Sequence, residues 1–97
     1  MAGTVEELTM RYEEDGVEVV RELDKSVLSK GAWATVIFRY QDWDRAKEAY
    51  GPEKYAIRRY KKTGGDYRQQ SKFTISSPDQ ARKLIDILTG WLDSPSA

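Results

Sequence analysis

The sequence predicts an α+β domain in which four antiparallel strands precede one C-terminal helix. Between residues 17 and 75, segments rich in Val, Ile, Tyr, Phe and Trp alternate with short turns that contain glycine. That pattern is typical of strands joined by hairpins. After residue 77 the apolar residues recur at three- and four-residue spacing, which is typical of an amphipathic helix. A chain of 97 residues fits one small domain with a thin core.

The strand segments are separated by recognisable breaks, so a meander is the simplest connection. The first break is a turn at residues 29–31. Residues 44–53 are polar and end in Gly-Pro, which indicates a connection with room for one helical turn. Residues 63–66 contain paired glycines, which supply the positive φ angles of a tight hairpin turn. The expected strands are 17–28, 32–43, 54–62 and 67–75.

The helix has a clear start. Ser77 is expected at the N-cap, Pro78 at the first helical position and Gln80 three residues after the cap. An apolar stripe follows that must be buried, so we expect the helix to cover one face of the sheet. The stripe consists of Ala81, Leu84, Ile85, Leu88 and Trp91 or Leu92.

Charge is segregated along a chain whose net charge is zero. Residues 1–24 hold eight acids against two bases, a net charge of −6, and residues 54–72 hold seven bases against Asp66, a net charge of +6. We expect residues 1–16 to form an acidic, flexible arm, residues 17–92 the folded domain, and residues 93–97 a disordered tail. Leu8, Met10 and Tyr12 alternate, so the arm also has the pattern of a weak edge strand. The segregation is typical of a polyanion-binding surface plus an acidic arm; alternatively, the arm and the basic segment neutralise each other within the fold.

Strand alternation separates an apolar face from a basic one. We expect Tyr55, Ile57, Phe73 and Ile75 to face the helix. Val36 and Phe38 suit the core, so Trp33, Arg39 and Trp43 would join the open face. The remaining members of that open face are Arg58, Tyr60, Lys62, Arg68, Gln70 and Lys72.

A face of cations and aromatic rings has a chemical interpretation. Cations neutralise phosphates and release counterions. Exposed rings stack on unpaired bases at about 1–3 kcal/mol per base. Together they favour single-stranded nucleic acid as the ligand. The alternative is an ordinary solvated sheet face, where Lys and Arg keep strands soluble.

The composition argues against several other functions. The sequence has no Cys and no His, which removes disulfides, thiolate chemistry, the commonest general base and the commonest metal ligand. The carboxylate pair Glu13-Glu14 lies in the expected arm, and no helix follows Gly64-Gly65 as a phosphate-binding loop would require. We therefore expect no enzyme activity, no metal and no cofactor. No apolar run could span a membrane and no secretory signal is evident, so we expect a cytoplasmic protein, associated with the nucleoid if it is bacterial.

Short motifs in the second half of the chain resemble a known family. They are Tyr-Ala-Ile-Arg-Arg-Tyr at 55–60, a polar hairpin, Ser-Lys-Phe-Thr-Ile-Ser at 71–76, and a helix that opens Ser-Pro-Asp-Gln. This order resembles the DNA-binding domain of the positive cofactor four family of transcriptional coactivators, and most closely its small bacterial stand-alone members. Lys30-Gly31-Ala32-Trp33 resembles the Gly-Trp that opens the second strand in bacterial members. The resemblance covers roughly residues 17–92.

The resemblance implies a curved four-stranded antiparallel sheet and a homodimer formed through the C-terminal helix and the sheet edge. It also implies binding of single-stranded or melted DNA, and in some members RNA, with little sequence preference. Carried over by position, Arg58 matches the strand arginine on the DNA side and Tyr60 a stacking aromatic. Lys72 matches the lysine before the last strand's apolar run, and Lys54 the basic residue that opens the third strand.

We therefore predict a largely sequence-nonspecific single-strand-binding protein that acts in transcription, replication or repair. The alternative is a protein-interaction or dimerisation module that binds no nucleic acid. In that case the Trp-rich strand 32–43 and Trp91 form the contact surface, and the acidic arm engages a basic partner. The predicted nucleic-acid-binding residues are Lys30, Trp33, Arg39, Lys54, Arg58, Tyr60, Lys62, Arg68, Gln70 and Lys72.

Overall fold

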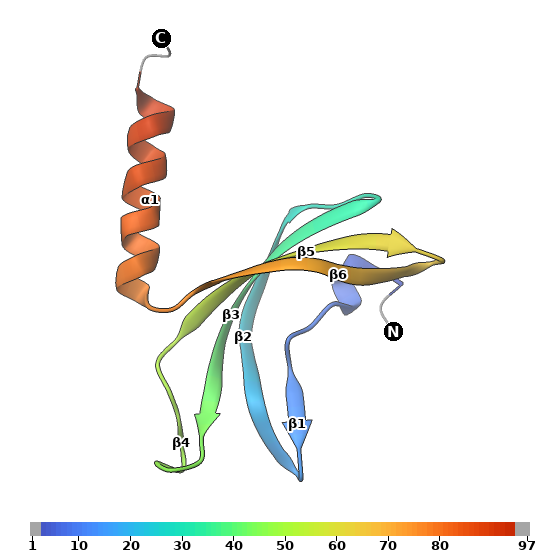
Figure 1. Ribbon diagram of the computed structural model, residues 1–97, viewed down its shortest axis with the longest axis vertical. Helices are drawn as coiled ribbons and strands as arrows, with labels where there is room; N and C mark the ends of the chain where they lie inside the picture. The colour runs from blue at the N-terminus through green and yellow to red at the C-terminus, as the bar shows by residue number, and fades with distance from the viewer. Residues whose placement is uncertain (1–2, 95–97) are drawn as a thin grey trace.

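The computed structural model describes residues 3–94 and has the predicted α+β fold (Figure 1). Four of its strands match the predicted strands to within one residue at each end, and two short strands add to them. Of the expected tail, Asp93 is the last helical residue, Ser94 is the C-cap, and residues 95–97 lie outside the described residues. The elements are a 3-10 turn η1 (Val5–Glu7), strands β1 (Tyr12–Glu14), β2 (Val17–Ser29), β3 (Trp33–Asp44), β4 (Ala49–Tyr50), β5 (Lys54–Thr63) and β6 (Asp66–Ile75), and helix α1 (Pro78–Asp93).

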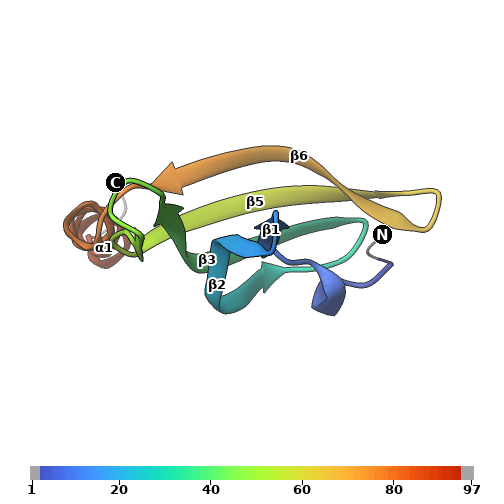
Figure 2. The same cartoon turned by 90° about the horizontal axis from the view of Figure 1, so that it is seen from below.

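The strands form one antiparallel sheet in the order β1-β2-β3-β5-β6, and β4 pairs with the end of β3. The sheet curls like half of a barrel, from β6 round to β2 and β1 (Figure 2). The β5–β6 hairpin turns at Gly64 and Gly65, whose φ angles of 60° and 88° suit glycine, as the sequence predicted. Between β3 and β5 the connection forms the short β4 hairpin in place of a helical turn.

One face of β3, which we call the inner face, carries the core. Ala34, Val36 and Phe38 are each 0% exposed and alternate with residues of the opposite, outer face. The pairing of β3 with β5 places Tyr60 opposite Ala34 and Ala56 opposite Phe38. Val36 and Phe38 therefore lie in the core, as predicted.

The inner face is covered by the N-terminal segment, defined as residues 3–10. Val5 and Leu8 are buried against the core, and Met10 is partly buried beside them. Where the sequence indicated a loose acidic arm, the structure has a packed segment that continues into β1. The physical reason is that Ala34, Val36 and Phe38 form an apolar stretch of the inner face of β3, which must be shielded from water. Val5 and Leu8 supply the apolar surface that does so.

A single lysine fixes the N-terminal segment to β2. The Nζ atom of Lys25 donates hydrogen bonds to the carbonyl oxygens of Val5, Glu6 and Leu8, at 2.8, 3.0 and 2.7 Å. These carbonyls lie in or next to η1. The Val5 oxygen also accepts from the Leu8 amide at 3.1 Å, and the short turn leaves the carbonyls at its C-terminal end without helical partners. The ammonium group therefore satisfies several backbone acceptors at once.

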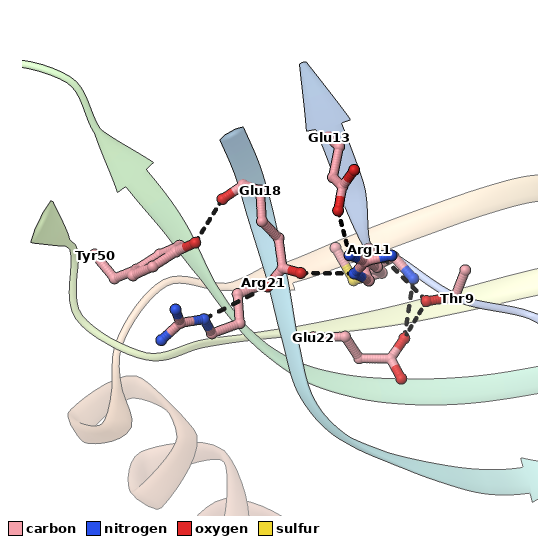
Figure 3. A network of polar contacts seen from close by, with 8 residues as sticks. Thr9, Arg11, Glu13, Glu18, Arg21, Glu22 and Tyr50 are labelled. Atoms are coloured by element: carbon pink, nitrogen blue, oxygen red, sulfur yellow. Dashed lines mark hydrogen bonds and ion pairs between the residues drawn. The ribbon is translucent and has the colours of Figure 1, made fainter. Parts of the chain in front are cut away.

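Carboxylates of β2 hold the rest of the segment (Figure 3). The Glu22 carboxylate accepts from the Thr9 hydroxyl at 2.8 Å and from the next backbone amide at 3.0 Å. Arg11 donates through Nε to Glu18 at 2.6 Å and also pairs with Glu13. The hydrogen bond with Arg11 lowers the pKa of the Glu18 carboxyl and raises that of the guanidinium. Acids of the first 24 residues are thus used to fix the N-terminal segment and β1 to β2.

Helix α1 begins as the sequence predicts. The Ser77 hydroxyl accepts from the Gln80 amide at 3.1 Å, and the Gln80 side chain accepts in turn from the Ser76 amide at 2.8 Å. This is a capping box whose second bond reaches one residue further back than usual.

The expectation that the helix covers one face of the sheet is wrong. Helix α1 has no buried residue and projects beyond the end of β6 (Figures 1 and 2). Pro78, Ala81 and Leu84 are half-buried, where the first turns lie beside the buried Ile75. The inner face is already occupied by Val5 and Leu8, so the helix has no core face to cover. Of the residues expected to face the helix, Phe73 and Ile75 line a small groove against α1, and Tyr55 and Ile57 lie opposite them on the outer face of β5.

We expect Leu8→Ala to lower the free energy of unfolding by about 2–3 kcal/mol, since it removes a buried side chain from the cover of the inner face. Urea unfolding followed by tryptophan fluorescence measures the change. Leu28→Ala is the matched control: Leu28 is 61% exposed, and its truncation should change stability by less than about 0.5 kcal/mol. Equal unfolding midpoints for the wild type and Leu8→Ala would show that the segment does not protect the core.

Candidate nucleic-acid interface

A β-bulge at Gln70 decides which cations of the β5–β6 hairpin share a face. Arg59 pairs with Ser71, but the next residue, Tyr60, pairs with Gln69, so Gln70 is an extra residue in β6. An inserted residue reverses the alternation of side chains beyond it.

The bulge separates residues that the sequence analysis had placed together. Arg68 lies opposite Lys61 on the outer face, whereas Lys72 lies opposite Arg58 on the inner face. The expectation that Arg68 and Lys72 share one face is therefore wrong. A strict period of two holds only for an uninterrupted strand.

The outer face carries a cluster of cations around an exposed indole. Trp33 is 43% exposed and pairs directly with Lys61. The guanidinium carbon of Arg59 lies 4.6 Å from its ring centroid and the Lys61 Nζ 5.5 Å, both within cation–π range. Arg68 adds a third cation opposite Lys61. We call Trp33, Arg59, Lys61 and Arg68 the outer-face cluster.

The three cations of the outer-face cluster are not neutralised. Among residues 3–94, the ion pairs of the structure involve other basic residues. Arg59, Lys61 and Arg68 are all exposed. The cluster therefore presents net positive charge, with an aromatic ring inside it, to solvent.

The outer face continues from the cluster toward the helix as an apolar row. Ile37, Ile57 and Phe73 pair in register across β3, β5 and β6, and Phe73 is 56% exposed. Beyond this row, Arg39 pairs with Tyr55. Arg39 has one partner, Glu53, whose carboxylate lies 3.4 Å away. The predicted open-face residues Trp33, Arg39 and Arg68 thus do lie on one face.

Tyr60 does not lie on an open face, and that expectation is wrong. Tyr60 is 5% exposed and belongs to the hydrophobic core. The reason is its partner Ala34, a small residue that leaves room for the ring over the inner face. Burial raises the pKa of the Tyr60 hydroxyl above its ordinary value of 10.0, and the neighbouring Arg58 opposes that rise.

Arg58 lies beside Tyr60 on the same inner face. Its guanidinium carbon is 6.0 Å from the Phe38 ring centroid, and its Nε is buried without a hydrogen-bond acceptor. The directly opposite residue is Lys72, which is exposed. Arg58 is half-buried, so a ligand can reach only part of its side chain. Lys72 lies on the inner face, on the other side of the sheet from the outer-face cluster.

The other predicted binding residues are dispersed. Lys62 is exposed on the inner face with its Nζ 5.5 Å from the Tyr67 ring centroid. Gln70 is exposed at the bulge and donates to the Arg68 carbonyl oxygen at 3.3 Å. Gln70 therefore contacts the outer-face cluster through the Arg68 backbone, and Lys62 lies on the opposite face of the sheet.

The two remaining predicted cations, Lys54 and Lys30, have carboxylate partners. Lys54 lies near the far end of β5, where its Nζ donates to Asp42 at 3.0 Å; this bond raises the pKa of Lys54. Lys30 is near Trp33 in sequence, and its Nζ is 3.9 Å from the Glu6 carboxylate. Such exposed pairs contribute little energy, so Lys30 stays available to another anion.

Sequence reasoning missed Arg59 and Lys61, which it had assigned to the helix-facing side with Tyr55 and Ile57. One signal could have found them. Ala34, Val36 and Phe38 form an apolar set in β3, and the matching set in β5 contains Ala56 and Tyr60, with Arg58 between them. Pairing the two strands through those sets places Arg59 and Lys61 on the outer face.

Two further searches of residues 3–94 were negative. They hold no group of three or more His, Cys, Asp or Glu side chains able to hold a metal ion, and their one α-helix is too short and polar to cross a membrane. Comparison of the chain with protein-family models, with curated proteins and with solved structures gave no match.

We expect Tyr60→Phe to remove a component of the phenolate absorbance titration that lies above pH 10, because burial raises the pKa of Tyr60. The folded state holds this proton more tightly than the unfolded state. The resulting stability is therefore complete below the ordinary pKa of 10.0 and is lost as the pH rises through the raised value. Urea unfolding measured below and above pH 10 should show a larger fall in the free energy of unfolding for the wild type than for Tyr60→Phe. If the component lost on Tyr60→Phe is instead centred near the ordinary pKa of 10.0, the hydroxyl lies in solvent and the burial is contradicted.

Proposed function

We propose that this protein binds single-stranded nucleic acid, DNA foremost, through the outer-face cluster and acts in transcription, replication or repair. The observation that carries the proposal is the group of cations near the exposed ring of Trp33. Arg59 and Lys61 lie within cation–π range of that ring, and Arg68 lies opposite Lys61. These three cations have no carboxylate partner within residues 3–94. This arrangement joins a stacking platform to phosphate-binding charges.

The energetics favour a single strand over a duplex. A base that stacks on Trp33 contributes about 1–3 kcal/mol, and duplex bases are already stacked on one another. A stacked base also displaces Arg59 or Lys61 from the ring, which frees that cation for the adjoining phosphate. Three cations on three phosphates give a logarithmic salt dependence of about −2 for a single strand.

The resemblance to the positive cofactor four family supports the same class of ligand. It assigns the contacts, however, to Arg58, Tyr60 and Lys72, which lie on the inner face. The buried ring of Tyr60 and the cover over the inner face favour the outer face instead. RNA offers the same stacking and phosphate contacts, so it is a ligand of the same kind.

The proposal includes a homodimer formed through α1 and the edge of β6. The radius of gyration is 15.8 Å, whereas a compact domain of this length has about 12.5 Å. The accessible surface is 6924 Å², about 1,200 Å² more than a folded monomer of this mass exposes. Each partner of a standard interface loses about 800 Å², so the excess is enough for one.

The uncovered surface is apolar where a second copy would contact it. A small groove of about 160 Å³ separates α1 from Phe73 and Ile75 of β6. The helix exposes five large apolar side chains that a lone chain has no means of covering: Ile85, Ile87, Leu88, Trp91 and Leu92.

The same helix favours a second candidate function, a protein-interaction module that binds no nucleic acid. Exposed apolar patches of this kind mark surfaces that bind proteins. A chain that ignores oligonucleotides at low salt but binds one protein through α1 would support this candidate.

We expect Trp33→Ala to weaken binding of a labelled oligothymidylate of about 20 nucleotides at least five-fold, the lower end of the stacking energy. Binding to a duplex of the same length should change much less. Fluorescence anisotropy at low and moderate salt measures both. Tyr12→Ala is the matched control, because Tyr12 is a 55% exposed aromatic residue away from the cluster. It should leave both affinities unchanged.

A pair of charge reversals in the same assay identifies the binding face. Lys61→Glu and Lys72→Glu make the same change in one hairpin, on opposite faces of the sheet. The outer-face cluster predicts the larger loss for Lys61→Glu. A larger loss for Lys72→Glu, or equal losses of single strand and duplex on Trp33→Ala, would contradict the proposed site.

We expect the wild-type chain to sediment as a dimer and Leu88→Glu to sediment as a monomer, because the charge would be desolvated at the helix contact. Analytical ultracentrifugation over a range of concentrations measures the state. The control Arg82→Glu reverses a charge on the polar side of α1 and should keep the dimer. A wild-type chain that remains monomeric at the highest concentration would rule out the second copy.

A further inference from the structure

A groove of about 310 Å³ opens on the outer face between β2 and β5. It lies where a bulge in β2, between Glu22 and Asp24, interrupts the pairing with β3. In the register of the sheet, Asp24 of β2 lies opposite Arg39 of β3, and Arg39 lies opposite Tyr55 of β5. These three side chains therefore share the outer face with Trp33. The groove is lined by Asp24, Lys25, Ser26, Ile37, Phe38, Arg39 and Tyr55.

The walls of the groove combine an apolar surface with one carboxylate, Asp24, and one guanidinium, Arg39. Ile37 and the ring of Tyr55 supply the apolar part. The Asp24 carboxylate accepts a hydrogen bond from the Lys25 amide at 2.8 Å, which orients it. Among residues 3–94 it has no ion-pair partner: Arg39, its cross-strand neighbour, pairs with Glu53 instead. Asp24 therefore has acceptor capacity left for a ligand.

These features suit one planar ring with N–H donors on its edge. The volume is at the small end of ligand pockets, which start near about 300 Å³. A carboxylate only accepts hydrogen bonds, so it selects for donors. Guanine offers two adjacent donors on its Watson–Crick edge, N1–H and the N2 amino group. The corresponding edge of thymine or uracil has one N–H between two carbonyl oxygens. A carboxylate repels those two oxygens.

We propose that this groove is a base pocket in which Asp24 recognises guanine, so that the otherwise nonspecific surface prefers guanine over thymine or uracil. The inference rests on the proposed function, because the base must belong to a strand held by the outer-face cluster. Trp33 and Ile37 are four residues apart on β3, about 13 Å along the strand. One extended nucleic-acid strand can therefore reach both. Tyr55 would stack on the base while Asp24 takes its edge donors.

The test compares two labelled probes by fluorescence anisotropy. One is an oligothymidylate of about 20 nucleotides, which is longer than the stretch that a single-strand-binding module of this kind occupies. The other is the same strand with one central guanine. The wild type should bind the guanine probe at least about five-fold more tightly, the lower end of what one good base contact gives. Asp24→Asn should bind both probes equally. Asp86→Asn on α1 removes the same charge outside the groove and should keep the preference.

Each outcome separates the pocket from the proposed function. Equal wild-type affinity for both probes, with binding that still depends on Trp33, overturns the base pocket alone. A preference that survives Asp24→Asn in a variant with unchanged urea unfolding also overturns it. If the wild type binds neither probe at low salt, the proposed function fails and the pocket with it.

Discussion

The ammonium group of Lys25 holds the carbonyl oxygens of Val5, Glu6 and Leu8, and much of the structure follows from that contact. It fixes the apolar side chains of Val5 and Leu8 over the inner face, where Phe38 and its neighbours would otherwise meet water. A cover made by the N-terminal segment leaves the C-terminal helix with no core face to occupy. The helix therefore projects from the end of β6, and the outer face of the sheet stays open.

Charge segregation along the chain has a structural explanation in the same region. The acids of the first 24 residues bind largely to their own neighbours, as Glu18 does with Arg11 and Glu22 with Thr9. The basic β5–β6 hairpin is therefore not neutralised from that side. On its inner face Arg58 lies directly opposite Lys72, and like charges in such a pair are destabilising. The outer face holds a second such pair, Lys61 opposite Arg68, and the proposed nucleic-acid ligand would relieve the repulsion of that pair.

Local structure could be predicted from the sequence, whereas the faces of the strands could not. The strand bounds, the Gly64-Gly65 turn and the Ser77 cap depend on a few adjacent residues, and the structure has them as predicted. The exposure of Tyr60 was predicted wrongly because it depends on which residue of β3 lies opposite it. The Gln70 bulge has no local signature, yet it moves every later side chain to the other face. The role of Val5 and Leu8 is a contact between segments far apart in the sequence, which propensity does not reveal.

The open helix and the outer-face cluster lie at opposite ends of β5 and β6, so the proposed dimer contact and the proposed nucleic-acid site do not overlap. Helix α1 follows Ile75, which pairs with Tyr55, while the cluster is centred on Lys61 and Arg68. Tyr55 and Lys61 are six residues apart, about 20 Å along the strand. A second copy seated on α1 and the adjoining edge of β6 would therefore leave both clusters exposed. Two clusters on one rigid dimer raise the effective concentration of the second site for a strand long enough to reach it. Tight binding could then arise from a cluster that holds only a few phosphates in each copy.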